Sequence, residues 1–223
     1  MALNISRGNM YEFITHTWNT VKGECFHDCS YCYMKRFGKR SPIRFDQGEL
    51  KTDLGQGNYI FVGSSCDMWA ENIPVEWITK TLDHCSKHDN RYLFQTKNPQ
   101  RFTEFQLPRN SVVCTTIETN RWYPAIMFNS PFPEDRVEQM KRLAYPRYIT
   151  IEPIIDFDME EFVEMIQACN PVQVNIGSDT GHNDLPEPSA DKILKLVERL
   201  QKFTVVHNKT NLKRVLNTEK LKF

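Results

Sequence analysis

Short apolar segments alternate with amphipathic segments along most of the chain. Continuous apolar runs bounded by turn residues are typical of buried strands, whereas apolar residues three or four positions apart are typical of helices. This pattern predicts strands near residues 11–21, 58–63, 91–97, 112–118, 148–151, 172–176 and 203–207. It predicts helices from about residue 72 onward and over 134–143, 158–169 and 189–202. The segment 35–57, rich in charge and glycine, is expected to be a long, partly helical connection.

The regular alternation of strands and helices indicates βαβ crossovers and therefore a parallel sheet. No Gly-x-Gly-x-x-Gly follows the first predicted strand, as a dinucleotide-binding fold would require. The pattern therefore predicts an α/β fold, a partly closed (β/α) barrel of about six units. The length is typical of one domain, so residues 1–223 are expected to form a single unit.

Composition narrows the classes of function only a little. The 223 residues are 40% hydrophobic and carry 28 basic and 28 acidic side chains, so the net charge gives no global reason to expect a polyanionic partner. A local basic patch stays possible. Because no run of about 18 apolar residues and no apolar signal sequence is found, we expect a cytoplasmic protein that does not enter a membrane. In that compartment clustered thiols indicate metal or redox ligands before disulfides.

Three cysteines lie within eight residues, spaced Cys25-x3-Cys29-x2-Cys32, directly after the first predicted strand. In a (β/α) barrel this position is the C-terminal rim, where such folds carry their chemistry. Thiolates so close together repel one another unless a cation or a cluster neutralises them. A structural zinc ion normally takes four ligands, and His27 or Cys66 could complete that set. A [4Fe–4S] cluster on three thiolates instead leaves one iron open for a small molecule.

Polar residues also follow the alternation of the later strands. Residues two apart share one face of a strand. The polar sets that share a face are Gln95 and Lys97; Cys114, Thr116 and Glu118; Thr150 and Glu152; and Gln173 and Asn175. A dry core does not tolerate so many unpaired polar groups, so these sets predict a shared polar cavity at the strands' C-terminal ends. The alternative is that they face outward into water.

The cysteine motif carries a family resemblance. Cys25-x3-Cys29-x-Tyr31-Cys32, with an aromatic residue before the third cysteine, resembles the signature of the radical S-adenosylmethionine (SAM) superfamily. The surroundings are similar to spore photoproduct lyase-like proteins and to a phage-associated radical SAM family of unknown substrate. Residues 61–68, 94–97 and 151–153 extend the resemblance over most of residues 15–180. It implies a partial (β/α)6 barrel of radical SAM type, with a [4Fe–4S] cluster on the three cysteines.

The resemblance also implies an activity. The cluster would cleave SAM reductively to methionine and a 5′-deoxyadenosyl radical, which abstracts hydrogen from a substrate. An electron donor such as flavodoxin or ferredoxin is then an implied partner. The substrate is unassigned, and the lyase-like resemblance alone favours a nucleic acid or nucleotide. The basic clusters in 35–40 and 209–214 would suit one, but a solvated basic helix face is the more common explanation of such a cluster. The competing hypothesis is a non-enzymatic zinc-binding module with a structural cysteine loop.

The resemblance places SAM contacts on several residues. Gly63, Ser64, Ser65 and Asp67 stand where the family's methionine-binding segment lies, but they depart from its common Gly-Gly-Glu form. The hydroxyls and Asp67 would therefore contact the SAM ammonium group, although Asp67 could equally be a cap or turn residue. Lys97 matches a lysine that meets the SAM carboxylate in lyase-like enzymes; alternatively it faces solvent.

The remaining roles are distributed over the predicted cavity. The resemblance implies that Tyr31 packs on the adenine and that Thr116 or Glu118 addresses the ribose, with Glu152 as a further cofactor-binding candidate. Cys114 shares the inward face of Thr116 and could relay a hydrogen atom, or it could be a small buried core residue.

Overall fold

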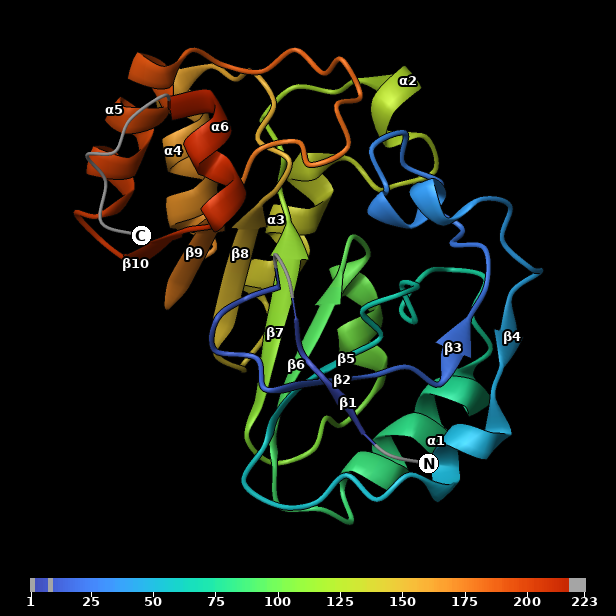
Figure 1. Ribbon diagram of the computed structural model, residues 1–223. Coiled ribbons are helices and arrows are strands. Elements are labelled where there is room, and N and C mark those ends of the chain that lie inside the picture. The colour runs from blue at the N-terminus through green and yellow to red at the C-terminus, as the bar shows by residue number, and fades with distance from the viewer. Residues whose placement is uncertain (1–2, 8–9, 217–223) are drawn as a thin grey trace.

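The computed structural model describes residues 3–7 and 10–216 (Figure 1). Its centre is an eight-stranded sheet in the order β1-β2-β5-β6-β7-β8-β9-β10. Every neighbouring pair is parallel except β1 with β2. The strands are β1 (Asn4–Ile5), β2 (His16–Trp18), β5 (Tyr59–Val62), β6 (Arg91–Thr96), β7 (Ser111–Thr116), β8 (Arg147–Ile151), β9 (Gln173–Ile176) and β10 (Val205–Asn208). The expected α/β fold with a mostly parallel sheet is confirmed.

Helices connect the parallel strands, as the alternating pattern predicts. The α-helices are α1 (Val75–Cys85), α2 (Pro124–Met127), α3 (Pro133–Lys141), α4 (Met159–Ala168), α5 (Ala190–Leu200) and α6 (Lys213–Leu216). Short 3-10 helices are η1 (Tyr33–Phe37), η2 (Gln47–Lys51), η3 (Pro99–Glu104) and η4 (Thr210–Leu212). No helix of the described residues is long and apolar enough to cross a membrane.

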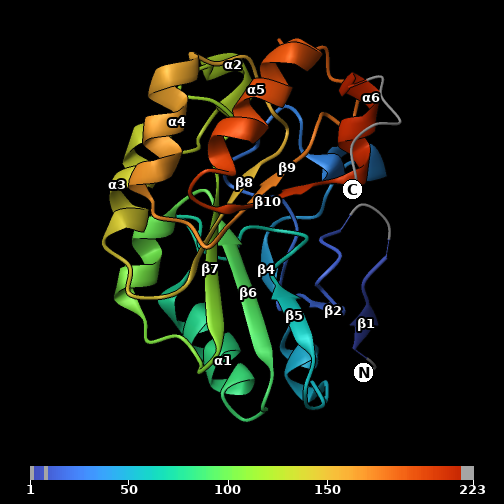
Figure 2. The same cartoon turned by 90° about the vertical axis from the view of Figure 1, so that its left-hand side faces the viewer.

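The sheet buries apolar side chains on both faces, but in unequal amounts. One face packs Ile60, Phe94 and Ile149 into the main core beneath the helices, and Figure 2 shows α3 and α4 along that side of the strands. The opposite face carries a smaller apolar cluster, in which Leu93 packs with Tyr11 of the N-terminal segment. The N-terminal segment therefore covers part of this second face, and its Tyr11 also reaches the cavity at the strands' carboxyl ends.

The first expected strand, over 11–21, is shorter in the structure and is split. Residues 16–18 form β2, while Val21–Lys22 forms β3, which pairs with β4 (Arg44–Phe45) in a separate two-stranded sheet. Lys22 fixes this small sheet through ion pairs with Asp46 at 2.8 Å and Glu49 at 2.6 Å. The chain between β3 and β4 contains all three clustered cysteines, so this small sheet closes the base of the cysteine loop.

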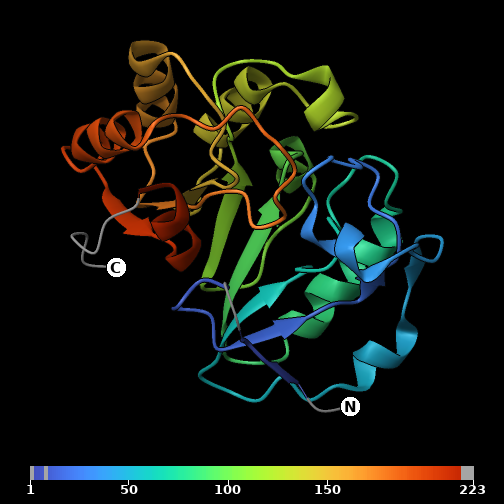
Figure 3. The same cartoon turned by 45° about the horizontal axis from the view of Figure 1, so that its top comes forward.

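Gly23 makes the closure of that base possible. Its φ is +113°, a backbone conformation that side chains rarely adopt. A Cβ atom at this position would lie 2.5 Å from the backbone oxygen of Pro42. The two ends of the cysteine loop thus approach too closely for any residue but glycine. Figure 3 shows the loop projecting beside the carboxyl ends of β5 and β6.

Candidate functional site

The three clustered cysteines line one cavity of about 850 Å³ at the carboxyl ends of the parallel strands. Cys29 is buried, and Cys25 and Cys32 are half-buried. Within the described residues, no three His, Cys, Asp or Glu side chains are already arranged around a single-ion position. The Cys66 thiol, which contacts the backbone oxygen of Glu24 at 3.8 Å, lies near Cys25 and lowers the pKa of Cys25 to about 6.

A segment distant in sequence holds the cysteine loop from outside. The amide of Ser30 donates to the backbone oxygen of Ile126 at 2.9 Å, and the Asn129 side chain donates to the backbone oxygen of Phe26 at 2.9 Å. Ser130 contacts the Cys29 thiol at 3.3 Å. The sequence gives no signal for this bracing, because these residues lie about a hundred positions away from the loop, in α2 and the irregular segment that follows it.

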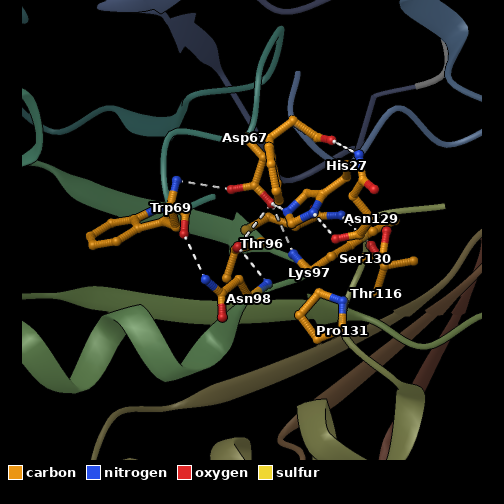
Figure 4. Close-up of polar contacts among 12 residues, drawn as sticks. His27, Asp67, Trp69, Thr96, Lys97, Asn98, Thr116, Asn129, Ser130 and Pro131 are labelled. Atoms are coloured by element: carbon orange, nitrogen blue, oxygen red, sulfur yellow. Dashed lines mark hydrogen bonds and ion pairs between the residues drawn. The ribbon is translucent and has the colours of Figure 1, made fainter. Parts of the chain in front are cut away.

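Asp67 joins the cysteine loop to the sheet (Figure 4). Its Oδ2 accepts hydrogen bonds from His27 Nε2 at 2.9 Å, Thr96 Oγ1 at 2.8 Å and the Lys97 amide at 3.0 Å. Its Oδ1 accepts from the Trp69 amide at 3.0 Å, which is the turn contact expected as one of two roles for this residue. Burial raises the pKa of Asp67, but the hydrogen bond and charge of His27 outweigh it and the net pKa is lowered.

The turn after β5 carries the predicted Gly63-Ser64-Ser65 segment to the cavity wall. Gly63 has a φ of +83° and donates its amide to the backbone oxygen of Trp18 at 2.9 Å. Asn19, which sequence analysis did not single out, accepts from the Ser65 amide at 2.9 Å. The turn is therefore fixed by the backbone of Trp18 and the side chain of Asn19, and its serines line the same cavity as the cysteines.

Glu118 organises the charges at the inner wall. The carboxylate is fully buried and pairs with the equally buried Arg136 at 2.7 Å and with Lys97 at 3.3 Å. Tyr31 donates its hydroxyl to the same carboxylate. Burial raises the pKa of Glu118, but the charges of Arg136 and Lys97 lower it to about 2. Two cations thus share one carboxylate, which leaves one net positive charge beside the cavity.

Some of the residues expected to contact SAM line the cavity, and one is buried behind its wall. Tyr31, Lys97 and Thr116 line the cavity, and Lys97 Nζ lies 5.3 Å from the centre of the Tyr31 ring. Glu118, which was expected near a ribose, has no exposed surface and lies behind Tyr31 and Lys97. The solvent-facing alternative for Lys97 does not apply, because only 15% of its side chain is exposed.

The far wall of the cavity contains the remaining expected residues. Glu152 lines it and pairs with Lys209 at 2.6 Å, a partner that sequence analysis placed only in a basic cluster. A Cβ atom on Gly177 would lie 2.7 Å from Glu152 Oε1, so the glycine makes room for this carboxylate.

The polar strand faces point inward, but only part of each predicted set lines the cavity. Gln95, Lys97, Thr116 and Glu152 line it, whereas the others are buried outside its lining: Cys114, Glu118, Thr150, Gln173 and Asn175. The Tyr11 hydroxyl contacts Gln95 and Thr150, each at 2.7 Å, and Gln95 donates to Thr116 at 3.1 Å. Cys114 contacts Thr150 at 3.4 Å and is fully buried, and burial raises the pKa of its thiol to about 12. The outward-facing alternative for these strand residues is wrong.

Comparisons with known proteins add a family and a fold. A family model described as "Protein of unknown function (DUF5131)" matches residues 9–183. No curated protein matches the sequence. A spore photoproduct lyase double mutant with bound AdoMet and dinucleoside spore photoproduct is similar in structure, with a TM-score of 0.59 and 13% identity. The match covers 90% of this chain and 66% of that one.

A second solved structure, of a single-substitution spore photoproduct lyase variant, gives a TM-score of 0.59 at 11% identity. That match covers 91% of this chain and 66% of the lyase. This chain therefore spans slightly less than two thirds of the length of the lyases it resembles. Spore photoproduct lyase is a radical SAM enzyme, and at such low identity the likeness shows a shared fold alone.

Replacing Asp67 by Asn tests whether this carboxylate fixes the cysteine loop. The variant removes the charge that accepts three of the hydrogen bonds at Oδ2, so we expect the free energy of unfolding to fall by about 2 kcal/mol. Urea unfolding measures the change. Asp28→Asn is the matched control, since the side chains of the Asp28–Lys35 pair are 59% and 45% exposed and the change should alter stability by less than about 0.5 kcal/mol. Equal effects of the two substitutions would contradict the assignment.

Replacing Glu118 by Gln tests the buried charge cluster through its pH dependence. The ordinary pKa of 4.5 falls to about 2 in the folded protein. The carboxylate therefore stabilises the fold above about pH 5, by about 3 kcal/mol, and this contribution disappears as the pH falls toward 2. The stability difference between the native chain and Glu118→Gln should shrink over that range in urea unfolding. A difference independent of pH would show that Glu118 is not the ionised partner of Arg136.

Proposed function

The chain belongs to the DUF5131 family of proteins of unknown function, and we propose that this member is a radical SAM enzyme built on a partial (β/α)6 barrel of radical SAM type. The observation that carries the proposal is the placement of Cys25, Cys29, Cys32 and Lys97 around one cavity. This cavity lies at the carboxyl ends of parallel strands in a fold similar to that of a radical SAM enzyme. The fold alone would not suffice, because one fold hosts many functions.

The residues present suit the two cofactors. Thiolates are the ligands that iron–sulfur clusters take, and three of them leave one iron free for another ligand. Cys25, Cys29 and Cys32 are all reduced and all face the cavity. The unbalanced positive charge of Lys97 and Arg136 over Glu118 favours an anionic group nearby. A cluster on three thiolates and the carboxylate of SAM both meet that requirement.

We assign the following roles. The cysteines would hold a [4Fe–4S] cluster, Lys97 would contact the SAM carboxylate, and Tyr31 and Thr116 would contact the adenosine portion. When bound and reduced, the cluster would cleave SAM to methionine and a 5′-deoxyadenosyl radical that abstracts hydrogen from the substrate. An electron donor such as flavodoxin or ferredoxin would supply the electron.

The protein's own residues would keep this site in place. Asp67 saturates its oxygens with four protein donors and so acts as a positioning residue for the cysteine loop. Ser64 and Ser65, which line the cavity, would then provide hydroxyls for the SAM ammonium group. Glu118 orients Lys97 and Tyr31 from behind, and Glu152 faces the opposite side of the cavity with Lys209. Cys114 is fully buried and contacts Thr150. It could therefore relay a hydrogen atom to or from the substrate only through a neighbouring side chain.

Anaerobic reconstitution with iron and sulfide tests the cluster. We expect a brown protein with about four irons per chain, and reductant-dependent formation of 5′-deoxyadenosine. Cys29→Ala should lose the cluster, because it removes the most buried of the three thiols. Cys85→Ala is the matched control, since Cys85 is fully buried in the core away from the cavity and should keep all the iron. Stoichiometric zinc without iron would instead favour a structural zinc site, for which Cys66 beside Cys25 supplies a fourth thiol.

Lys97→Gln tests the SAM contact separately. The variant keeps a polar side chain, one atom shorter than lysine, but removes the charge, so we expect SAM affinity to fall at least about tenfold while the iron content is unchanged. Equilibrium dialysis with labelled SAM measures the affinity. Lys141→Gln, which alters an exposed pair with Glu138, should leave it unchanged. Unaltered SAM affinity in Lys97→Gln would remove Lys97 from the site.

A further inference from the structure

The segment that follows Cys32 forms a charged edge on the cavity. Within residues 33–40 the chain has four cations and no carboxylate. Its basic members and Tyr33 line the mouth of the cavity, and Phe37 beside them is 64% exposed. We call this set the basic rim: Tyr33, Lys35, Arg36, Phe37, Lys39 and Arg40. In a chain with zero formal net charge, such a concentration of one sign needs a physical reason.

Three of the four cations of the basic rim are not neutralised within the protein. Lys35 forms an ion pair with Asp28 at 2.8 Å. Among the described residues, Arg36, Lys39 and Arg40 form no ion pair. Like charges so close in sequence repel one another. The repulsion is relieved when an anionic ligand binds.

The cavity's own carboxylates offset the rim only in part. Asp67 is held by His27, Asp28 by Lys35 and Glu152 by Lys209. Glu24 and Asp179 also line the cavity, but the three rim cations without an ion pair outnumber these two carboxylates, so the side of η1 keeps a net positive charge. A ligand that enters here would meet cations first.

Aromatic rings accompany the charges. The Arg36 guanidinium lies 5.8 Å from the centre of the Tyr33 ring and 5.1 Å from the centre of the Phe37 ring. The Tyr33 hydroxyl donates to the backbone oxygen of Ser64 at 2.7 Å, which fixes its ring against the turn after β5. Exposed rings interleaved with guanidinium groups are the combination that stacks unpaired bases and holds phosphates.

The hollow continues past the rim. A second cavity of about 230 Å³ is lined by Tyr33, Lys35 and Arg36 on one side and by Thr180, Gly181 and Asn183 on the other. Tyr33, Lys35 and Arg36 also line the main cavity, so the two hollows adjoin along η1. A compact metabolite would fill only the inner cavity. A chain-like ligand would use both hollows and the cations between them.

We propose that the basic rim binds the sugar–phosphate backbone of a single-stranded nucleic acid and presents one of its nucleotides to the main cavity. This inference rests on the proposed function, for which it names the substrate class. Arg36, Lys39 and Arg40 contact phosphates on the strand, and Phe37 and Tyr33 stack against its bases. An acidic electron-donor protein would also be attracted to the rim, but on this face it would cover the cavity mouth through which a substrate must enter.

Binding of a fluorescein-labelled oligonucleotide of about 12 nucleotides, as DNA and as RNA, tests the proposal. Fluorescence anisotropy at several salt concentrations is measured on the full chain, with and without reconstituted iron. We expect the double variant Arg36→Glu/Lys39→Glu to bind at least about tenfold more weakly, with a salt slope reduced by about 0.7 for each lost phosphate contact. The matched control is Lys195→Glu/Lys202→Glu, which changes the charge equally at exposed positions of α5 and its end and should bind as the native chain.

Phe37→Ala separates stacking from charge. Loss of the ring should weaken binding roughly fivefold or more and leave the salt slope unchanged, because stacking releases no counterions. Phe132→Ala, which removes a ring that is 50% exposed outside the cavity lining, should have no effect. Equal effects of the two substitutions would overturn the stacking role.

The rates of cluster reduction by reduced flavodoxin and by dithionite complete the test. If Arg36→Glu/Lys39→Glu slows reduction by flavodoxin alone and binds the oligonucleotide as well as the native chain, the rim is a donor-docking surface and the proposal is wrong. Oligonucleotide binding equal in the rim variant and its control also overturns it. Failure of the radical SAM proposal is distinguishable, since it removes iron and 5′-deoxyadenosine formation while oligonucleotide binding is measured without either.

Discussion

A carboxylate that is buried and charged must be surrounded by donors, and the architecture of this site follows from that constraint at Asp67. Its donors come from the cysteine loop, from the turn after β5 and from the end of β6. No two of these segments are adjacent in sequence. The constraint therefore fixes the cysteine loop relative to the strand ends, and the cavity is the space enclosed between them.

Glu118 on the inner wall is also a buried, charged carboxylate, but the charge around it is not balanced. The hydrogen-bond donors of Asp67 satisfy its carboxylate, whereas Glu118 carries one negative charge against the two positive charges of Arg136 and Lys97. Burying two cations against one anion is stable only where a further anion or solvent compensates the excess charge. The excess lies beside Cys29, where the charge of Lys97 opposes the effect of burial, although burial is larger and the net pKa of the thiol is raised. The inner wall is thus prepared for negative charge at the place where the thiols face the cavity.

The features that the sequence predicts correctly are those set by residues close together along the chain. The distance from Cys25 to Cys32 is set by a few covalently connected residues, and the face shared by Gln95 and Lys97 is set by strand alternation. Both features can be recognised without knowing the fold. The mostly parallel sheet follows in the same way from the regular spacing of apolar segments, and the structure confirms it.

Contacts across long sequence separations account for what sequence analysis missed. Arg136 lies on a charged helical segment that resembles a solvated surface, yet it is fully buried against Glu118. Asn129 and Lys209 reach the site from irregular segments. The sequence placed Glu118 on the correct face of its strand but could not show that its carboxylate lies too deep to contact a ribose. The strand ends at Thr116, and Tyr31 covers the carboxylate.

Electron paramagnetic resonance of the anaerobically reconstituted and reduced protein, recorded with and without SAM, tests the central claim most directly. The account predicts the signal of a reduced [4Fe–4S] cluster that changes when SAM is added, because the iron without a cysteine ligand accepts SAM. An iron–sulfur signal that SAM leaves unchanged, or no such signal in a folded protein, would contradict it.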